Sequence, residues 1–204
     1  MALKGILQSL AMIPVHAVEG AAVRWRFAAR LYGLLGLVYR FPRRQMDFGE
    51  QDFVREVVPG GRLLDLGCGP GYLTGLLEGR FRQSVGLDGR REMMAGAKNF
   101  APGSVFVQAD MTRLPFADEA FDAVVSLGAV HCVDYGILAQ EICRVLTPGG
   151  EAHVLIEDRV IPLVAPRTSG ARLGESLEAA GFEVAGDFRI GFLYRYIKAR
   201  KKAD

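Results

Sequence analysis

The chain has 204 residues, of which 50% are hydrophobic and 24% are charged, so its size suits one α/β domain with a full hydrophobic core plus an extension. A net charge of +2 gives no indication of the basic surface of a nucleic-acid-binding protein, and we expect no nucleic-acid partner. The three cysteines are an odd number without a C-x-x-C pair, so they indicate neither a disulfide framework nor a metal site.

Residues 1–47 are the unusual part of the chain, and we expect them to form an N-terminal helical extension before a domain that spans residues 48–204. Apolar residues recur at spacings of three and four over residues 21–41, which predicts a helix. One tryptophan and two tyrosines, spaced by seven, form a second apolar face, so this helix needs two partners. One partner is the domain itself. The other could be the substrate, a second subunit of a homo-oligomer or a bilayer surface.

The predicted helix is framed by arginines, and its uncharged run over residues 31–39 is far shorter than the roughly 20 residues that a membrane span requires. We therefore do not expect it to cross a bilayer. Residues 21–44 interleave basic and aromatic side chains, which is compatible with peripheral contact at a membrane surface. The alternative is a lid that packs over the active site while its arginines are solvated.

The segment Leu63–Gly71 joins a predicted buried strand to the start of a predicted helix through a glycine-rich loop. Asp65 lies near the end of the strand, and Gly67, Gly69 and Gly71 follow at alternating positions. Glycine permits positive φ angles and lets a ligand approach the backbone closely. Doubly wound folds bind nucleotide-like ligands at such a strand, loop and helix N-terminus.

The glycine spacing excludes two common nucleotide motifs, because it is neither G-x-G-x-x-G nor a phosphate loop with its lysine. Asp65 would repel a pyrophosphate but suits a ligand with an ammonium or sulfonium group. The segment resembles motif I of class I S-adenosylmethionine-dependent methyltransferases, whose usual form is D-x-G-x-G-x-G. The resemblance implies that Asp65 and the loop bind the methionine end of S-adenosylmethionine. Cys68 belongs to this predicted binding segment, although its small side chain alone explains its presence.

The next two predicted strands also end in acids. Asp88 ends the second strand, where an acid is placed to accept hydrogen bonds from both ribose hydroxyls. Asp110 ends the third, and the family resemblance implies that Asp110 and the backbone N–H of Met111 contact adenine. Leu114–Phe116 resembles the family segment beside the adenine pocket. Phe116 could equally be an ordinary core aromatic.

Later elements complete the predicted fold. They are a strand over residues 121–127, a helix over 138–146, a strand over 151–157, a helix that ends at Gly181, and two strands over 183–190 and 192–199. The first of these strands resembles the family's fourth strand, and Leu127 at its end joins the predicted cofactor-binding set. We therefore predict a doubly wound, seven-stranded Rossmann-like methyltransferase sheet with a closing antiparallel hairpin. The resemblance covers residues 60–199 and is closest to ubiquinone/menaquinone-type, small-molecule methyltransferases.

His131 is the one candidate acid or base. It follows the fourth predicted strand, where the resemblance implies that the acceptor binds. An imidazole with a pKa near neutrality could deprotonate a phenol or an activated carbon acid. The alternative is a histidine that only packs under the methionine arm of the cofactor.

These features predict an enzyme that transfers a methyl group from S-adenosylmethionine to a small-molecule acceptor, with lipid or quinone-like molecules as the leading class. The aromatic and basic character of the extension motivates that choice of acceptor. We expect a cytoplasmic protein, with or without peripheral membrane association, because the cofactor is made in the cytosol. The alternative is a non-catalytic S-adenosylmethionine-binding or scaffold protein on the same fold. An aminopropyl transferase is disfavoured because the sequence shows no acidic cluster for a polyamine.

Overall fold

The computed structural model describes residues 50–130, 133–157, 170–190 and 194–203. The predicted extension over residues 1–47 and the candidate base His131 lie outside these ranges, so the hypotheses about them stay predictions. None of the described helices combines the length and the apolar composition that crossing a membrane would require.

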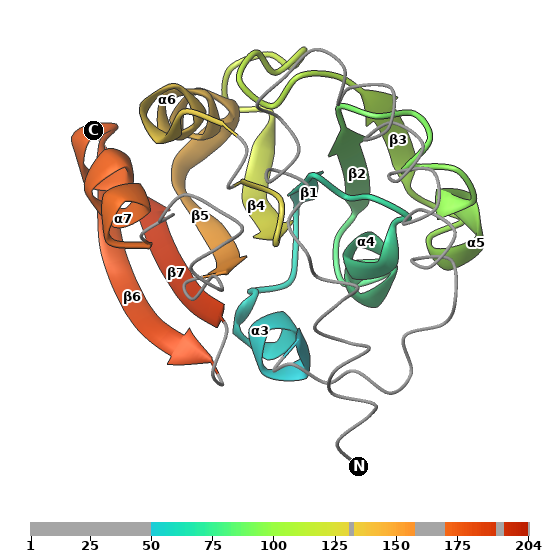
Figure 1. Ribbon diagram of the computed structural model, residues 1–204, viewed down its shortest axis with the longest axis horizontal. Helices are drawn as coiled ribbons and strands as arrows, with labels where there is room; N and C mark the ends of the chain where they lie inside the picture. Colours follow the sequence, from blue (N-terminus) through green and yellow to red (C-terminus); the bar gives the residue numbers. More distant parts are fainter. Residues whose placement is uncertain (1–49, 131–132, 158–169, 191–193, 204) are drawn as a thin grey trace, which may run out of the picture.

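A seven-stranded sheet forms the centre of the domain, in the order β3-β2-β1-β4-β5-β7-β6 (Figure 1). Its strands are β1 Arg62–Leu66, β2 Gln83–Asp88, β3 Val105–Gln108, β4 Phe121–Leu127, β5 Leu146–Glu157, β6 Phe182–Ile190 and β7 Tyr194–Lys201. The strands from β3 to β5 are parallel, whereas β7 runs antiparallel to both β5 and β6. The predicted doubly wound sheet with a closing antiparallel hairpin is confirmed.

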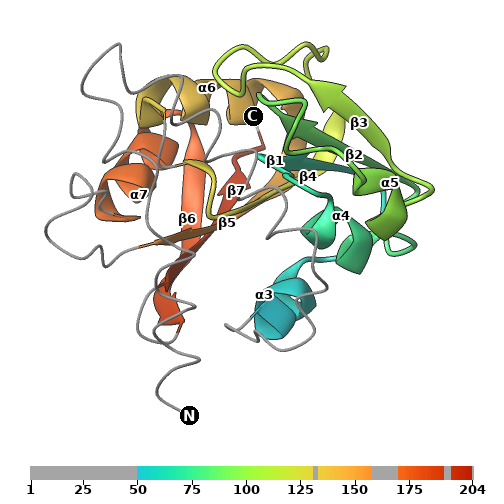
Figure 2. The same cartoon turned by 45° about the vertical axis from the view of Figure 1, so that its right-hand side comes forward.

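Helices cover both faces of this sheet (Figure 2). They are α3 Glu50–Glu56, α4 Tyr72–Leu77, α5 Ala97–Phe100, α6 Tyr135–Val145 and α7 Gly170–Ala179. Buried residues of α6 and α7 pack on one face, and those of α3 and α4 pack on the other. Strand β1 contributes side chains to the cores on both faces of the sheet. Leu64 and Leu66 pack on the face covered by α6 and α7, and Leu63 packs on the face covered by α3 and α4.

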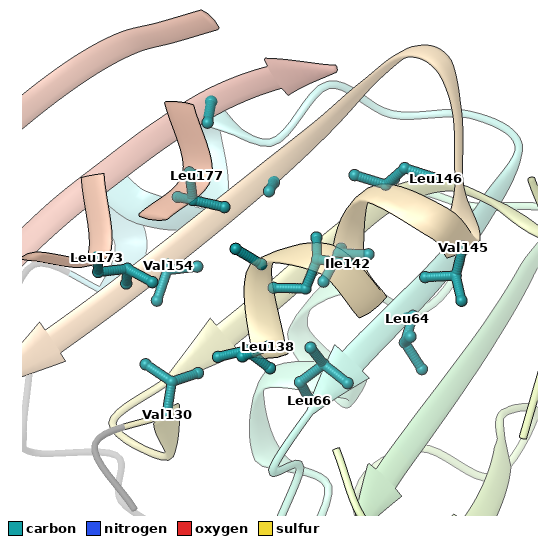
Figure 3. Packing of buried hydrophobic residues seen from close by; sticks show 14 of the residues in the cluster. Leu64, Leu66, Val130, Leu138, Ile142, Val145, Leu146, Val154, Leu173 and Leu177 are labelled. Atoms are coloured by element: carbon teal, nitrogen blue, oxygen red, sulfur yellow. The ribbon is translucent and has the colours of Figure 1, made fainter. Parts of the chain in front are cut away.

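The larger core lies between the sheet and helices α6 and α7. Leu138 and Ile142 of α6 and Leu173 and Leu177 of α7 are all fully buried there (Figure 3). Each such side chain contributes roughly 1.5–3 kcal/mol through its removal from water. Helix α6 starts at Asp134, whose side chain accepts a hydrogen bond from the backbone N–H of Ile137 at 3.0 Å. Apolar burial and this cap together fix α6 on this face of the sheet.

The predicted start of the fifth strand is wrong. Helix α6 already ends at Val145, and β5 begins at Leu146, so the Thr147–Gly150 segment lies inside the strand. Leu146 pairs with Phe121, but the next pair joins Glu151 to Ala123, which is a shift of register. The φ angle of Gly149 is +77°, and proline at position 148 cannot donate to the ladder. The Pro-Gly-Gly run therefore forms an irregularity within β5 rather than a separate loop.

A buried polar cluster lies between the sheet and α3. Nδ1 of His153 in β5 lies 2.6 Å from the hydroxyl of Tyr196 in β7, and its Nε2 lies 3.1 Å from a carboxylate oxygen of Glu151. Phe53 of α3 meets the edge of both rings. Burial lowers the pKa of His153 to about 4, although Glu151 opposes the shift. His153 is therefore a neutral structural histidine in β5, where the parallel strands meet the antiparallel hairpin.

The order of the strands decides where a ligand can bind. From β1 the chain continues to β2 and β3 on one side, and it then crosses to β4 on the other side of β1. The connections that leave the carboxyl ends of β1 and β4 therefore diverge, and doubly wound folds bind ligands in the crevice between them.

Candidate active site

The glycine loop follows β1 at this point of divergence. Gly67, Gly69 and Gly71 have φ angles of +69°, +49° and +80°, a conformation that other residues rarely adopt. A Cβ atom at Gly67 would lie 2.1 Å from the Cβ of Ala129, and one at Gly71 would lie 3.0 Å from the ring of Phe106. The first and third glycines are thus required by packing within the protein. The first contact also shows that the loop after β1 touches the segment after β4.

The middle glycine is different. Among the residues that the structure describes, a Cβ atom at Gly69 would meet only the methyl group of Met93, at 3.9 Å, and one at Gly128 would meet none within 4 Å. Gly69 follows β1 and Gly128 follows β4, so both lie at the carboxyl edge of the sheet. Open space beside these two backbones would allow a ligand to approach them closely.

Asp65 is enclosed behind the glycine loop, with 1% of its surface exposed. One of its carboxylate oxygens accepts a hydrogen bond from the hydroxyl of Thr74 at 2.6 Å, and the backbone N–H of Thr74 also donates to it. The N-cap residue of α4 is Gly71, which has no side chain to perform this function. Asp65 thus replaces a local cap and joins the end of β1 to the start of α4.

This position has an electrostatic consequence. Burial raises the pKa of Asp65 to about 7, and the negative charge of Asp88 adds to the shift while the hydrogen bonds from Thr74 oppose it. The contact with a methionine ammonium that the sequence implied for Asp65 stays a prediction. The structure gives this carboxyl group a partner inside the protein.

Asp88 is half-buried at the end of β2 and is connected to the glycine loop. One carboxylate oxygen accepts a hydrogen bond from the backbone N–H of Gly69 at 3.0 Å, and the other accepts one from the backbone N–H of Arg90 at 2.9 Å. Burial raises its pKa, and these two bonds oppose the shift. Each oxygen can accept a further hydrogen bond, so two ligand hydroxyls could also be bound.

The third acid lies next to the same edge. Asp110 is exposed, and one of its oxygens accepts hydrogen bonds from the backbone N–H and the hydroxyl of Thr112, at 2.8 and 2.7 Å. These bonds lower its pKa. The methyl group of Met111 would lie 3.5 Å from a Cβ atom at Gly67. The structure thus brings the predicted adenine-binding segment against the predicted methionine-binding loop.

Other predicted residues have more ordinary surroundings. The side chain of Cys68 is buried, and its sulfur would lie 2.9 Å from a Cβ atom at Gly86 of β2. Because this side chain is buried, any contact with a cofactor would involve the backbone of Cys68, and burial also raises the pKa of the thiol. Leu127 is half-buried against the cluster under α3 and α4. Phe116 packs edge-on against Phe121 with ring centroids 4.9 Å apart, which favours its core interpretation.

Sequence reasoning missed three kinds of contact. It did not identify Thr74 as the partner of Asp65, although an acid followed nine residues later by threonine at a helix start was a usable signal. No pattern pointed to Met93 beside Gly69. The pair Glu141 and Arg144, which binds the loop after β3, was also missed because the two segments are far apart in sequence.

Comparison with known proteins agrees with this geometry. Residues 64–154 match a family described as "Methyltransferase domain". A protein of Mycobacterium ulcerans named "Probable phthiotriol/phenolphthiotriol dimycocerosates methyltransferase 2" is 33% identical over 129 residues, which are 61% of this chain and 47% of that protein. A protein of Mycolicibacterium smegmatis named "Probable S-adenosylmethionine-dependent methyltransferase" is 31% identical over 136 residues, 61% of this chain and 53% of that one.

Over residues 64–154 the chain thus resembles a methyltransferase domain, and the two curated relatives just described are named as methyltransferases. Its fold is also that of a crystal structure of a SAM dependent methyltransferase from Aquifex aeolicus, with a TM-score of 0.69 at 19% identity, over 82% of this chain and 97% of the other. The chain spans about half the length of the curated relatives described above.

The relatives indicate S-adenosylmethionine as the cofactor, and the described residues fit it. The open backbone at Gly69 can approach a ligand, and the carboxylate of Asp88 beside it suits a pair of ribose hydroxyls. Asp110 and Met111 lie next to the same loop.

Proposed function

We propose that this protein transfers a methyl group from S-adenosylmethionine to a small-molecule acceptor. The observation that carries the proposal is the hydrogen bond from the N–H of Gly69 to Asp88, which joins the open glycine loop to the acid at the end of β2. This arrangement lies where the strand order reverses, in the crevice that doubly wound folds use for ligands. The methyltransferase relatives support the same reaction.

The residues of this chain would act mainly by positioning. S-adenosylmethionine supplies a methyl group on a positively charged sulfur, and its leaving group is neutral. Asp88 would accept hydrogen bonds from the ribose hydroxyls, while the loop backbone would hold the methionine end. The segment at Asp110 and Met111 would bind adenine. Fixing the cofactor and the acceptor in line lowers the barrier by removing the entropy cost of their encounter.

We further propose a lipid or quinone-like acceptor. The relative in Mycobacterium ulcerans is named for phthiotriol and phenolphthiotriol dimycocerosates, which supports a lipid-like substrate. The mixture of basic and aromatic residues over 21–44 would suit contact with a membrane surface or with such a substrate. His131, in the segment between Val130 and α6, would remove a proton from an acidic acceptor.

The test is methyl transfer from isotopically labelled S-adenosylmethionine into a host-cell extract, with the organic and aqueous phases counted separately. We expect label in the organic phase with the native protein, and little label with Asp88→Ala at the same cofactor concentration. Label confined to the aqueous phase would contradict a lipid acceptor but support methyl transfer. Cofactor binding without transfer into extracts from several growth conditions would favour the non-catalytic alternative.

A further inference from the structure

The loop between β3 and β4 contains the predicted adenine-binding residues but has no regular secondary structure. It covers residues 109–120, all of which the structure describes. Backbone N–H and C=O groups in such a loop need hydrogen-bond partners outside a helix or sheet. Much of this bonding comes from one charged pair on α6.

Glu141 and Arg144 of α6 bind the backbone of this loop directly. A carboxylate oxygen of Glu141 accepts a hydrogen bond from the N–H of Leu114 at 2.6 Å. Arg144 donates one hydrogen bond to the carbonyl of Leu114 at 3.0 Å and another to the carbonyl of Phe116 at 2.7 Å. The guanidinium also contacts the carboxylate of Asp118 at 2.9 Å. Three positions of the loop are thus attached to one helix.

The two charged residues also form a salt bridge with each other. Nε and Nη2 of Arg144 each donate to a different carboxylate oxygen of Glu141, and both distances are 2.9 Å. The bonds from Arg144 lower the pKa of Glu141, and the same pairing raises the pKa of Arg144. Both groups therefore stay ionised. Because the guanidinium is planar, its two hydrogen bonds to Glu141, which form a fork, direct its remaining N–H donors toward the loop.

A short path connects this pair to the predicted adenine contacts. Leu114 is 4% exposed and follows Arg113, whose backbone N–H donates to the carbonyl of Asp110 at 3.1 Å. Any displacement of Leu114 would therefore move the turn that presents Asp110 and Met111.

We propose that Glu141 and Arg144 are positioning residues that set the adenine selectivity of the cofactor site through this loop. The inference rests on the proposed function, because Asp110 and Met111 contact adenine only if the cofactor binds along the glycine loop. Neither Glu141 nor Arg144 touches the cofactor in this account. They act by holding the loop at a fixed place relative to α6.

The experiment compares binding of S-adenosylhomocysteine with that of S-inosylhomocysteine, in which a carbonyl replaces the amino group of adenine. Arg144→Lys keeps the positive charge but removes the planar fork. We expect it to weaken S-adenosylhomocysteine binding about tenfold and S-inosylhomocysteine binding by less than about twofold, because only the adenine edge is misplaced. Calorimetry gives both dissociation constants.

The matched control is Arg195→Lys in β7. Arg195 forms the same kind of fork, with Nε and Nη2 directed at the carboxylate of Asp187 in β6. This pair lies on the closing hairpin, away from the glycine loop (Figure 1). We expect the control to leave both dissociation constants unchanged. If Arg144→Lys does not fold, Glu141→Gln, which keeps an oxygen acceptor for the N–H of Leu114, is used for the same comparison.

The outcomes separate this inference from the proposed function. An equal loss of affinity for both nucleosides, or no loss, would overturn the positioning role. A native protein that binds both nucleosides equally would overturn it too, while leaving cofactor use intact. A native protein that binds neither would overturn the proposed function and this inference together.

Discussion

Asp65 in β1 and His153 in β5 occupy similar places in the molecule, because both lie inside the same sheet with β4 between their strands. They are 1% and 0% exposed, and each forms a short hydrogen bond to a hydroxyl group, of Thr74 and Tyr196 respectively. Burial disfavours the charged form of each, so the pKa of the acid is raised to about 7 and that of the histidine is lowered to about 4.

The same physical cause gives opposite dependences on pH. The folded state holds the proton of Asp65 more tightly than the unfolded state, so its contribution to stability is complete below pH 4 and is lost as the pH rises to about 7. The folded state disfavours protonation of His153, so its contribution is complete above pH 6.5 and is lost as the pH falls to about 4. Between these limits the two groups partly compensate.

The comparison shows that a shifted pKa in a buried group reflects the burial of that group and does not by itself indicate a catalytic role. His153 lies in β5, where the parallel strands meet the antiparallel hairpin, and packs against Phe53 of α3. Asp65 adjoins the glycine loop, and the negative charge of Asp88 contributes to its raised pKa. A change in its protonation would therefore reach the cofactor-binding edge, whereas one at His153 would affect only folding.

Asp65→Asn is expected to break the compensation most strongly. The shift of its pKa from 3.8 to about 7 corresponds to at most about 4 kcal/mol of stability that declines with rising pH. Without the contribution of Asp65, the opposite contribution of His153 is no longer compensated. The free energy of unfolding should then increase with pH between 4 and 6.5. Urea unfolding at several pH values measures it, with the exposed Glu175→Gln as control. A profile parallel to that of the native protein would contradict the raised pKa.

His153→Gln is expected to have the opposite and slightly smaller effect. The lowered pKa of His153 corresponds to about 3 kcal/mol that is gained as the pH rises from about 4 to 6.5. The variant should therefore become less stable with rising pH over that interval. Tyr196→Phe, which removes the hydroxyl partner but keeps the imidazole, separates titration from hydrogen bonding. The same unfolding series applies, and a slope unaffected by His153→Gln would rule out this histidine as the source.

Asp88→Ala sharpens the comparison by removing the acid that would contact the ligand. Losing the hydrogen bonds that an ionised carboxylate accepts costs roughly 1.5–3 kcal/mol, so we expect the dissociation constant of S-adenosylmethionine to rise about 10- to 100-fold. Calorimetric titration measures this change. Unchanged affinity would refute the ribose assignment, and Asp187→Ala on the distant hairpin controls for loss of an acid.

Thr74→Val should produce the smallest effect. It removes the hydroxyl that bonds to Asp65 at 2.6 Å while preserving the shape of the side chain. We expect a loss of about 1 kcal/mol and a further rise in the pKa of Asp65, because this bond opposes that rise. Thr74→Ser should restore both, as measured by unfolding across pH. Failure of serine to recover the native values would show that the methyl group, rather than the hydroxyl, is what matters.

Most of the fold could be predicted because its signals are local. The apolar run at Leu63–Leu66, the glycines that follow it and the acid at Asp88 each lie within one element or one turn. The start of β5 was misplaced because Pro148 and Gly149 usually mark a loop, whereas here Leu146 already pairs with Phe121. Neighbouring strands decided that boundary.

The sequence by itself determined the order of the elements, the class of domain and the acids at the ends of β1 and β2, because side-chain periodicity and glycine spacing act over a few residues. Only the tertiary structure decided what those groups contact. Asp65 turned inward to Thr74, and the loop after Asp110 came to rest on Glu141, 27 residues beyond Leu114. Such contacts join segments that are far apart in the sequence. Their proximity depends on the strand order and on the packing of α6, which no local sequence pattern encodes.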